Sequence, residues 1–299
     1  MWCNDMTVSL ADHPLRTSDS EASIAGRYSC PNPRTLHTLF IGSPDIIRLI
    51  TFSLSSKLWR LYIMHPKSFV SNFWGAVHFN ICHYTGDDPA RVAASRQMLI
   101  SELGADAGSL IVPRRTHSAN VRVIDSLPVD PAAIEGVDAL VTRLPEVAVG
   151  VSTADCVPVV IVDERNGVAG VAHAGWRGAL GGVVHNTIDA MLELGADVSR
   201  MDVFFGPSIC CDCFEVGEEV AARFPEEYVV CRAEWPRPHI DLPAYVTGRL
   251  LSAGIPAERI RNFSPDLCTR CHPGRYFSAR ITGVESGRNF TFVMLKRKI

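Results

Sequence analysis

The sequence lacks a long hydrophobic run, and its charge is nearly balanced. None of its 299 residues belongs to a stretch of the roughly 18 uninterrupted apolar residues that a membrane span needs. A formal net charge of −3 gives no electrostatic reason to expect nucleic acid or an anionic membrane as a partner. The opening MWCNDMTVSLADHPLRTSD lacks the basic start and apolar core of a signal peptide. We therefore expect a cytoplasmic protein that binds neither nucleic acid nor membranes.

The cysteine content is also well below that of a disulfide-rich protein. Ten cysteines in 299 residues are too few for a small secreted disulfide scaffold, so we expect mostly reduced thiols. No internal repeat and no low-complexity linker is visible. With 47% hydrophobic and 20% charged residues, the composition is that of a soluble globular protein with ample material for a core.

The chain divides near residue 68 into an N-terminal extension (1–68) and one domain (69–299). The extension is rich in Ser, Thr, Pro and His up to residue 38, and one amphipathic helical pattern follows over residues 46–61. Two interpretations stay open. The helix packs on the domain, or the segment is a poorly ordered extension upstream of a true start at Met64.

The rest of the chain alternates between helical and strand-like patterns. A helix is predicted from the N-cap Asp88 and Pro89 to a stop at Gly104, and others are predicted over residues 183–194, 215–224 and 241–254. Apolar, β-branched runs predict strands on both sides of His117, in residues 136–156, and at 157–162, 168–171, 201–207 and 289–295. Residues 69–299 are therefore expected to form one α/β (mixed α+β) domain.

Three chemistry-bearing residues fall where a predicted strand meets a loop: His117, Cys156 and His173. Loops at strand ends are where rigid scaffolds present catalytic groups. One thiolate and two imidazoles suit zinc, with a fourth position open for water or substrate. Their spacing matches no compact metal motif, however. A buried cysteine with two satisfied core histidines, or a Cys-His nucleophile pair, would explain the same pattern.

Asp155 and Arg177 lie next to these residues in the sequence. Asp155 is either a structural carboxylate that accepts backbone hydrogen bonds, or a proton shuttle or partner of a ligating histidine. Arg177 stands in the glycine-rich HAGWRGALGG, where backbone N–H groups and a guanidinium together suit phosphate. Alternatively, Gly175 and Gly178 only allow tight turns there.

Two further cysteine pairs have the C-x-x-C spacing: Cys210 with Cys213, and Cys268 with Cys271. Two such pairs are typical of a structural Cys₄ zinc site. The gap between them is far longer than the usual roughly 15–20 residues, which favours the alternative interpretation that the thiols are reduced and packed. The H-x-E and P-C-x-x-C signature of the zinc cytidine deaminases is absent from the sequence.

Four segments taken together resemble one protein family. STADCVPVVIVD, GVAHAGWRGALGGVV, GPSICCDCFEVGEEV and CTRCHPGRYFSARITGVESGR occur in the order found in the YfiH-like proteins, also called laccase-domain or multicopper polyphenol oxidase proteins and regarded as purine nucleoside phosphorylases. The resemblance runs from about residue 79 to the C-terminus. It implies a single domain of layered sheets and helices, as a monomer or homodimer. It also implies a metal held by His117, Cys156 and His173, with zinc favoured over copper.

The activities that the resemblance implies are phosphorolysis of purine nucleosides (adenosine, inosine, guanosine and methylthioadenosine) and deamination of adenosine. Cys156, His173 and Asp155 are then the expected catalytic residues. Phosphorolysis needs cations that hold phosphate against a ribosyl group with oxocarbenium character, and we expect Arg177 and Arg280 to do so. Arg280 otherwise reads as a surface or ion-pairing arginine.

The sequence departs from the family pattern in two places. The usual Phe-Thr-Thr-Arg and Gly-Gly-Val-Ser opening is not reproduced, and Ile281 follows Arg280 where members often carry a second arginine. Three other functions stay open. They are a cysteine hydrolase with Cys156 as nucleophile and His173 as base, a copper-dependent phenol oxidase, for which no axial ligand is evident, and a non-catalytic binding protein.

Overall fold

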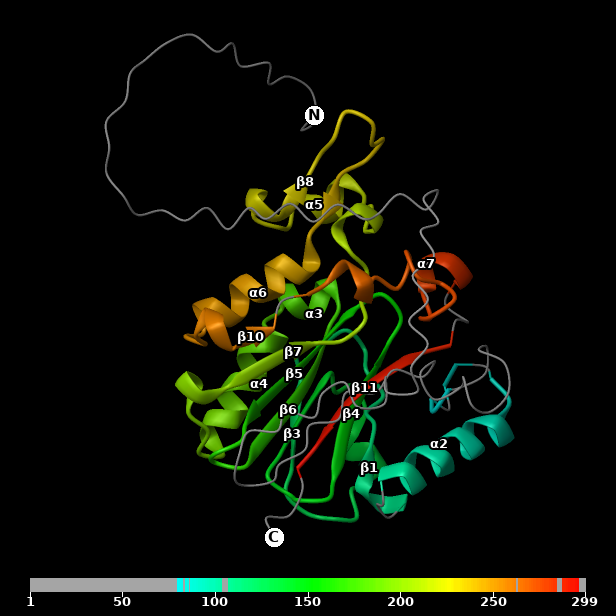
Figure 1. The fold of residues 1–299 in the computed structure, drawn as a ribbon, viewed down its shortest axis with the longest axis vertical. Helices are drawn as coiled ribbons and strands as arrows, with labels where there is room; N and C mark the ends of the chain where they lie inside the picture. The colour runs from blue at the N-terminus through cyan, green and yellow to red at the C-terminus, as the bar shows by residue number, and fades with distance from the viewer. Residues whose placement is uncertain are drawn as a thin grey trace, which may run out of the picture.

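The computed structural model describes residues 80–82, 84–85, 87–103, 107–261, 263–283 and 287–295. The extension 1–68 and the helix predicted over residues 46–61 lie outside the described residues, and so does Gly104. Within the described part, helices and strands alternate along the chain and build a mixed α/β fold (Figure 1).

Two sheets carry the fold in the described residues. The large sheet has six strands in the spatial order β10 (Ile260–Arg261), β7 (Asp202–Phe205), β5 (Val157–Asp163), β6 (Val168–Ala174), β3 (Ala139–Thr142) and β2 (Val121–Ile124). The small sheet has three, in the order β1 (Leu110–Ile111), β4 (Ala148–Thr153) and β11 (Asn289–Met294). A two-stranded ribbon, β8 (Val229–Val230) with β9 (His239–Ile240), stands apart from both sheets.

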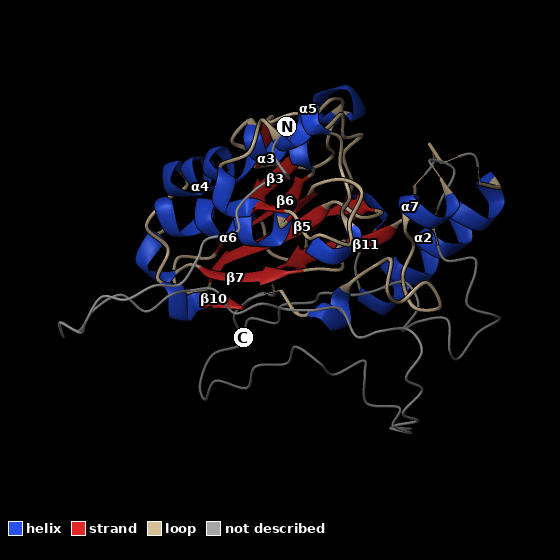
Figure 2. Cartoon of the chain, turned by 90° about the horizontal axis from the view of Figure 1, so that it is seen from above, coloured by secondary structure: helices blue, strands red, loops and turns tan. Residues whose placement is uncertain are grey.

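Helices cover the outer faces of the two sheets (Figures 1 and 2). α4 (Val183–Glu193) and α6 (Leu242–Ser252) lie against the large sheet, while α2 (Pro89–Leu103) lies against the small sheet. α2 begins as predicted, because the Asp88 carboxylate accepts a hydrogen bond from the backbone N–H of Ala90 at 2.9 Å. Asp241 caps α6 in the same way through the N–H of Ala244, also at 2.9 Å.

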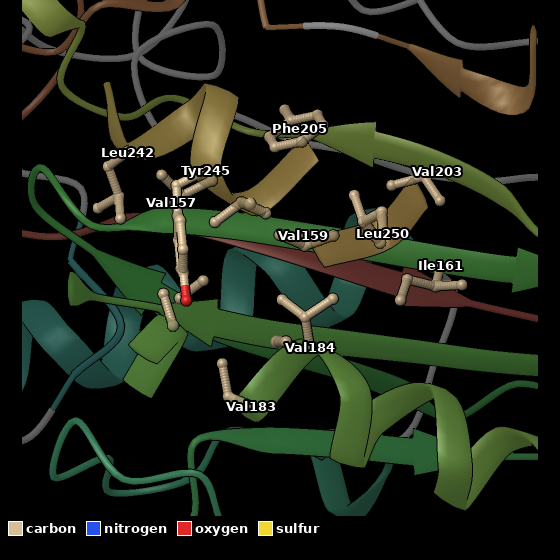
Figure 3. Packing of buried hydrophobic residues seen from close by; sticks show 14 of the residues in the cluster. Val157, Val159, Ile161, Val183, Val184, Val203, Phe205, Leu242, Tyr245 and Leu250 are labelled. Atoms are coloured by element: carbon tan, nitrogen blue, oxygen red, sulfur yellow. The ribbon is translucent and has the colours of Figure 1, made fainter. Parts of the chain in front are cut away.

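The central strands β3, β5 and β6 of the large sheet are buried along their whole length because both faces of the sheet are covered there. Val159 and Ile161 of β5 pack with α4 and α6, as Figure 3 shows for Val184 and Leu250. The alternate residues of β5 instead face the small sheet, since successive side chains in a strand point to opposite faces. The core therefore has a layer between the two sheets and a layer on each outer side.

The antiparallel hairpin of β5 and β6 fixes the geometry of the candidate site. Val157 pairs with Ala174 at its open end, and Pro158 pairs with His173. Cys156, directly before β5, therefore lies beside the end of β6 although it is distant from His173 in sequence. A turn at residues 164–167 closes the opposite end of the hairpin.

The helix predicted over residues 215–224 is shorter than expected. α5 covers only Glu218–Ala221, and Pro225 follows soon after, which disfavours helical conformation in the residue before it. The short strands β8, β9 and β10 have no clear period in the sequence and were not predicted. No helix in the described part of the chain has both the length and the apolar character of a membrane-spanning segment.

Candidate functional site

His117, Cys156 and His173, which we call the His-Cys-His cluster, meet at the open end of the hairpin. One ligand atom from each lies within 4.8 Å of the others. The two imidazole rings are edge to face, with centroids 4.9 Å apart. His173 is fully buried, and its Nε2 has no hydrogen-bond partner among the described residues. Because an unpaired buried nitrogen is costly, this arrangement points to a ligand at Nε2.

Asp138 positions both histidines, and sequence reasoning had missed it. Its carboxylate accepts backbone N–H groups from Thr116, His117 and Ser118 at 3.1, 3.0 and 2.8 Å, and it is bonded to Nδ1 of His173 at 2.8 Å. Burial alone would raise the pKa of Asp138, but the hydrogen bonds from His173 and Ser118 lower it well below its usual range. The carboxylate beside His173 is thus Asp138 and not Asp155.

The surroundings set the protonation of the His-Cys-His cluster. Burial lowers the pKa of His173 to about 3, and the charge of Arg115 acts in the same direction. Burial and Arg115 also lower the pKa of His117. Burial raises the pKa of the Cys156 thiol to about 11. Without a metal ion, the site at neutral pH therefore holds two neutral imidazoles, which are ready to coordinate, and a protonated thiol.

The glycines of HAGWRG allow the short helix α3 (Trp176–Leu180) to approach the site closely. A Cβ on Gly175 would lie 2.9 Å from Cδ2 of His117 and 3.0 Å from Sγ of Cys156. A Cβ on Gly178 would lie 2.7 Å from the carbonyl oxygen of Ser118. Gly175 has ordinary extended backbone at φ −69°, so close approach, and not a tight turn, explains its presence.

Asp155 lies beside the cluster and joins three chain segments. It has a left-handed backbone conformation at φ 85°, which Asp tolerates better than most residues. Its carboxylate accepts hydrogen bonds from the hydroxyl of Thr269 at 2.7 Å and from the backbone N–H of Arg280 at 2.8 Å. The structure therefore gives Asp155 a structural role, and its catalytic role stays a prediction.

The two arginines predicted to hold phosphate are both exposed. The guanidinium of Arg177 stacks on Trp176, 4.2 Å from the ring centroid. The guanidinium of Arg280 donates to the carbonyl of Glu215 at 2.8 Å, so only the backbone of Arg280 reaches Asp155. Their phosphate roles stay predictions.

Arg115 is a better-placed cation that the sequence analysis overlooked, although it stands two residues before His117. It is half-buried, and its Nε donates to Oγ of Ser152 at 3.2 Å, while the hydroxyl of Tyr84 bonds the same Oγ at 2.6 Å. One terminal nitrogen, Nη2, is buried without a partner among the described residues. Arg115 thus presents a donor group near the His-Cys-His cluster.

The two C-x-x-C pairs also come together. Cys210, Cys213, Cys268 and Cys271, which we call the four-cysteine cluster, have sulfur atoms within 4.8 Å of one another. The long sequence gap is bridged by a parallel pairing of Ser208 with Cys268. The four cysteines therefore form a second candidate metal site, and Thr269, between Cys268 and Cys271, connects it to Asp155.

Comparison with known proteins assigns the family. Residues 70–296 match the family described as multi-copper polyphenol oxidoreductase laccase, and the chain belongs to it. Adenosine deaminase RL5, from an unidentified prokaryote, is 45% identical over 73% of this chain and 87% of the relative. A purine nucleoside phosphorylase of Bacteroides thetaiotaomicron is 32% identical over 73% of this chain and 85% of the relative.

Solved structures of the same fold agree with the layered architecture. YlmD from Geobacillus stearothermophilus superposes with a TM-score of 0.68 at 26% identity, covering 81% of this chain and 93% of that one. The hypothetical protein YfiH of Bacillus licheniformis gives a TM-score of 0.67 at 22% identity, over 80% and 92% of the two chains, and supports the fold alone. The expected YfiH-like α/β fold is confirmed.

Proposed function

We propose that this protein is a zinc-dependent purine nucleoside phosphorylase that also deaminates adenosine. The relatives named above support the reaction class. The observation that carries the proposal is the meeting of His117, Cys156 and His173 around a buried imidazole nitrogen that has no partner among the described residues. Purine nucleosides and phosphate are the substrates.

The donor set fits zinc. One thiolate and two imidazoles are ordinary zinc ligands, and three protein ligands leave a position for water or substrate. Asp138 holds Nδ1 of His173, so the ring turns Nε2 toward the cluster, as carboxylates do behind many metal-bound histidines. When bound, zinc would polarise an attacking or leaving group and lower the pKa of a bound water to roughly 7.

The reactions place defined demands on the side chains. In phosphorolysis, a phosphate oxygen forms a bond to C1′ of the ribosyl group while the bond from C1′ to the purine nitrogen breaks. Cations must hold the phosphate anion against a sugar that is itself becoming positive. Arg115, with its buried unpartnered nitrogen, is the candidate that the geometry favours, beside the predicted Arg177 and Arg280.

Deamination replaces the amino group at C6 of adenine by the oxygen of a water and releases ammonia. The site must bring that water and the purine ring together. Gly175 leaves space directly beside His117 and Cys156, where a larger residue would collide with both. The hydrogen bonds of Asp138 keep both histidines in place while the substrate changes.

A second candidate function is a cysteine hydrolase. Asp138, His173 and Cys156 are arranged in the order of a carboxylate, an imidazole and a nucleophile. The raised pKa of Cys156 opposes this function, since the nucleophile must be a thiolate. Iodoacetamide distinguishes the two, because it alkylates a free catalytic thiolate and spares a zinc-bound one.

The test combines metal content and turnover on one preparation. Zinc and copper per chain are measured in the wild type and in Cys156→Ala, and each protein is incubated with adenosine and phosphate. We expect Cys156→Ala to contain one zinc fewer than the wild type and to form neither adenine nor inosine. The proposal would be overturned if Cys156→Ala had the same metal content and formed the same products as the wild type. It would also be overturned if the metal lost from Cys156→Ala were copper.

A further inference from the structure

The sulfur atoms of the four-cysteine cluster have the separations expected around one ion. Sγ of Cys271 lies 3.5 Å from Sγ of Cys213 and 4.0 Å from Sγ of Cys210. Four sulfurs at ~2.3 Å from a tetrahedral zinc ion would be about 3.8 Å apart. The observed separations lie on either side of that value, and both exceed the roughly 2.0 Å of a disulfide bond.

The backbone around Cys268 is arranged to stabilise a thiolate. Sγ of Cys268 accepts the backbone N–H groups of Cys210 and Cys271, each at 3.4 Å. One of these donors comes from its own C-x-x-C pair and the other from the opposite pair. Hydrogen bonds from N–H groups to a sulfur favour its charged form, which is the form that coordinates a metal.

The surroundings describe a closed site and not a reactive one. Cys268 is fully buried, Cys210 and Cys213 are nearly so, and all three belong to the apolar core that includes Ile209 and Phe214. The guanidinium of Arg270 donates to the carbonyl of Cys213 at 3.4 Å and places a positive charge beside the sulfurs. Four protein ligands leave no position for water or substrate, as in structural zinc sites.

The two loops of the four-cysteine cluster are also tied to the His-Cys-His cluster. Ser208 donates its backbone N–H to Leu267 at 3.2 Å and accepts that of Thr269 at 3.0 Å. Thr269, between the two cysteines of its pair, in turn donates its hydroxyl to the Asp155 carboxylate at 2.7 Å. Asp155 directly precedes Cys156, and its backbone carbonyl also accepts the N–H of Ile209, the neighbour of Cys210, at 2.9 Å. Two hydrogen bonds to Asp155, one from each C-x-x-C loop, therefore connect one cluster to the other.

We propose that Cys210, Cys213, Cys268 and Cys271 bind a second, structural zinc ion, which joins the loop after β7 to the loop of residues 265–271 and so holds Thr269 against Asp155. This ion is separate from the zinc of the proposed function. Its effect on the His-Cys-His cluster, but not its binding, depends on that function.

The experiment counts metal in the full chain with one cluster removed at a time. Native mass spectrometry is applied to the wild type, Cys156→Ala, Cys271→Ala and the double variant, with zinc as the metal supplied. Cys211→Ala, in the same turn as Cys210 and Cys213, is the matched control. X-ray absorption at the zinc edge on Cys156→Ala reports the ligands of the remaining ion.

We expect two zinc ions in the wild type and in Cys211→Ala, one in Cys156→Ala and in Cys271→Ala, and none in the double variant. The ion in Cys156→Ala should have a pure sulfur shell at about 2.3 Å. The proposal would be overturned if Cys156→Ala contained no metal, or contained an iron ion in place of zinc. It would also be overturned by nitrogen or oxygen ligands around the ion, or by a mass two hydrogens lower that indicates a Cys213–Cys271 disulfide. If Cys271→Ala does not fold, the sulfur shell of Cys156→Ala decides alone.

Failure of this proposal can be distinguished from failure of the proposed function. If the wild type binds a single ion and Cys156→Ala loses it, the catalytic zinc is supported and the structural zinc is contradicted. If the wild type binds a single ion and Cys156→Ala retains it, the structural zinc is supported and the catalytic zinc is contradicted.

Discussion

The His-Cys-His cluster and the four-cysteine cluster are both connected to Asp155, and they are built differently. The first combines two ring nitrogens with one sulfur and leaves His173 Nε2 and Arg115 Nη2 unsatisfied among the described residues. The second consists of sulfur alone, and Cys268 is already bonded to two backbone N–H groups. Unsatisfied polar groups indicate a place for a substrate, whereas a satisfied and buried set of ligands indicates a fixed support.

The largest expected difference between the clusters is in activity. Cys156→Ala should lower turnover of adenosine at least about 10³-fold, because a lost metal ion removes several kcal/mol of charge stabilisation, and should change the melting temperature little. Cys271→Ala should keep more than about a tenth of the activity but lose roughly 3 kcal/mol of stability, which corresponds to about 6–12 °C in melting temperature. Steady-state rates and thermal unfolding of both variants check this. If the two substitutions changed the rate and the melting temperature equally, the clusters could not be assigned different roles in catalysis and stability.

Asp138→Asn tests whether the histidines depend on one carboxylate. The amide cannot accept from three N–H groups and the His173 ring as the carboxylate does, so zinc affinity and activity should fall about 10–100-fold. The ion of the four-cysteine cluster should stay. Asp189→Asn, on the exposed side of α4, is the control. Competition with a zinc chelator measures the affinity, and unchanged affinity would contradict the assigned role of Asp138.

Gly175→Ala tests the close packing at the His-Cys-His cluster alone. The new methyl group would collide with His117 and Cys156, and overpacking of about 2 kcal/mol should weaken zinc binding there about 30-fold. Gly274→Ala is the control, since a Cβ at that position meets nothing within 4 Å. Chelator titration of both variants gives the comparison. A Gly175→Ala protein that binds zinc like the wild type would show that the site has more room than the structure indicates.

The pH dependence of zinc binding should also separate the clusters. In Cys271→Ala, which retains the His-Cys-His cluster, affinity should rise about tenfold per pH unit between pH 6.5 and 8. The reason is that Cys156, with its pKa raised to about 11, must lose one proton. His173, with its pKa lowered to about 3, is already neutral, and the lowered pKa of His117 favours its neutral form in this range. In Cys156→Ala the slope should be steeper, because four thiols release protons. A slope near three in Cys271→Ala below pH 6.5 would mean that the histidines titrate normally.

The smallest expected effect concerns the link between the clusters. Thr269→Val removes the hydrogen bond to Asp155, and a loss of about 1 kcal/mol should lower activity about fivefold while both zinc ions remain. Thr269→Ser should restore the rate because it keeps the hydroxyl. Thr247→Val, on α6, serves as the control for the substitution itself. Rates that stay at the wild-type level would show that the hydrogen bond from Thr269 to Asp155 does not couple the two clusters.

Much of the frame could be predicted from local patterns in the sequence. The caps Asp88 and Asp241 marked helix starts correctly, and β-branched runs located the hairpin of β5 and β6. The strand-end argument selected His117, Cys156 and His173, and the structure brings them together. The helix caps and the hairpin share a cause, since each of these signals lies within a few residues of its effect, whereas the meeting of the three ligands follows from the pairing of β5 with β6 and from the loop of His117.

The remaining features depend on contacts between distant segments. Asp138 stands at the start of an apolar run, and nothing nearby in sequence shows that it bonds a loop about 20 residues earlier and a ring in β6. The spacing of the four cysteines favoured a packed-thiol interpretation, because the pairing of Ser208 with Cys268 spans a long stretch of the chain. A single sequence contains no signal for either contact.

The bonds of Asp138 also have a consequence for motion. The loop that carries His117 and the strand that carries His173 are distant segments of the chain, and thermal motion would normally move them independently. Here the backbone N–H of His117 and Nδ1 of His173 are both hydrogen-bonded to Oδ1 of one carboxylate. A displacement of that carboxylate therefore moves the backbone of His117 and the ring of His173 together, and the two residues meet an incoming ion as a pair.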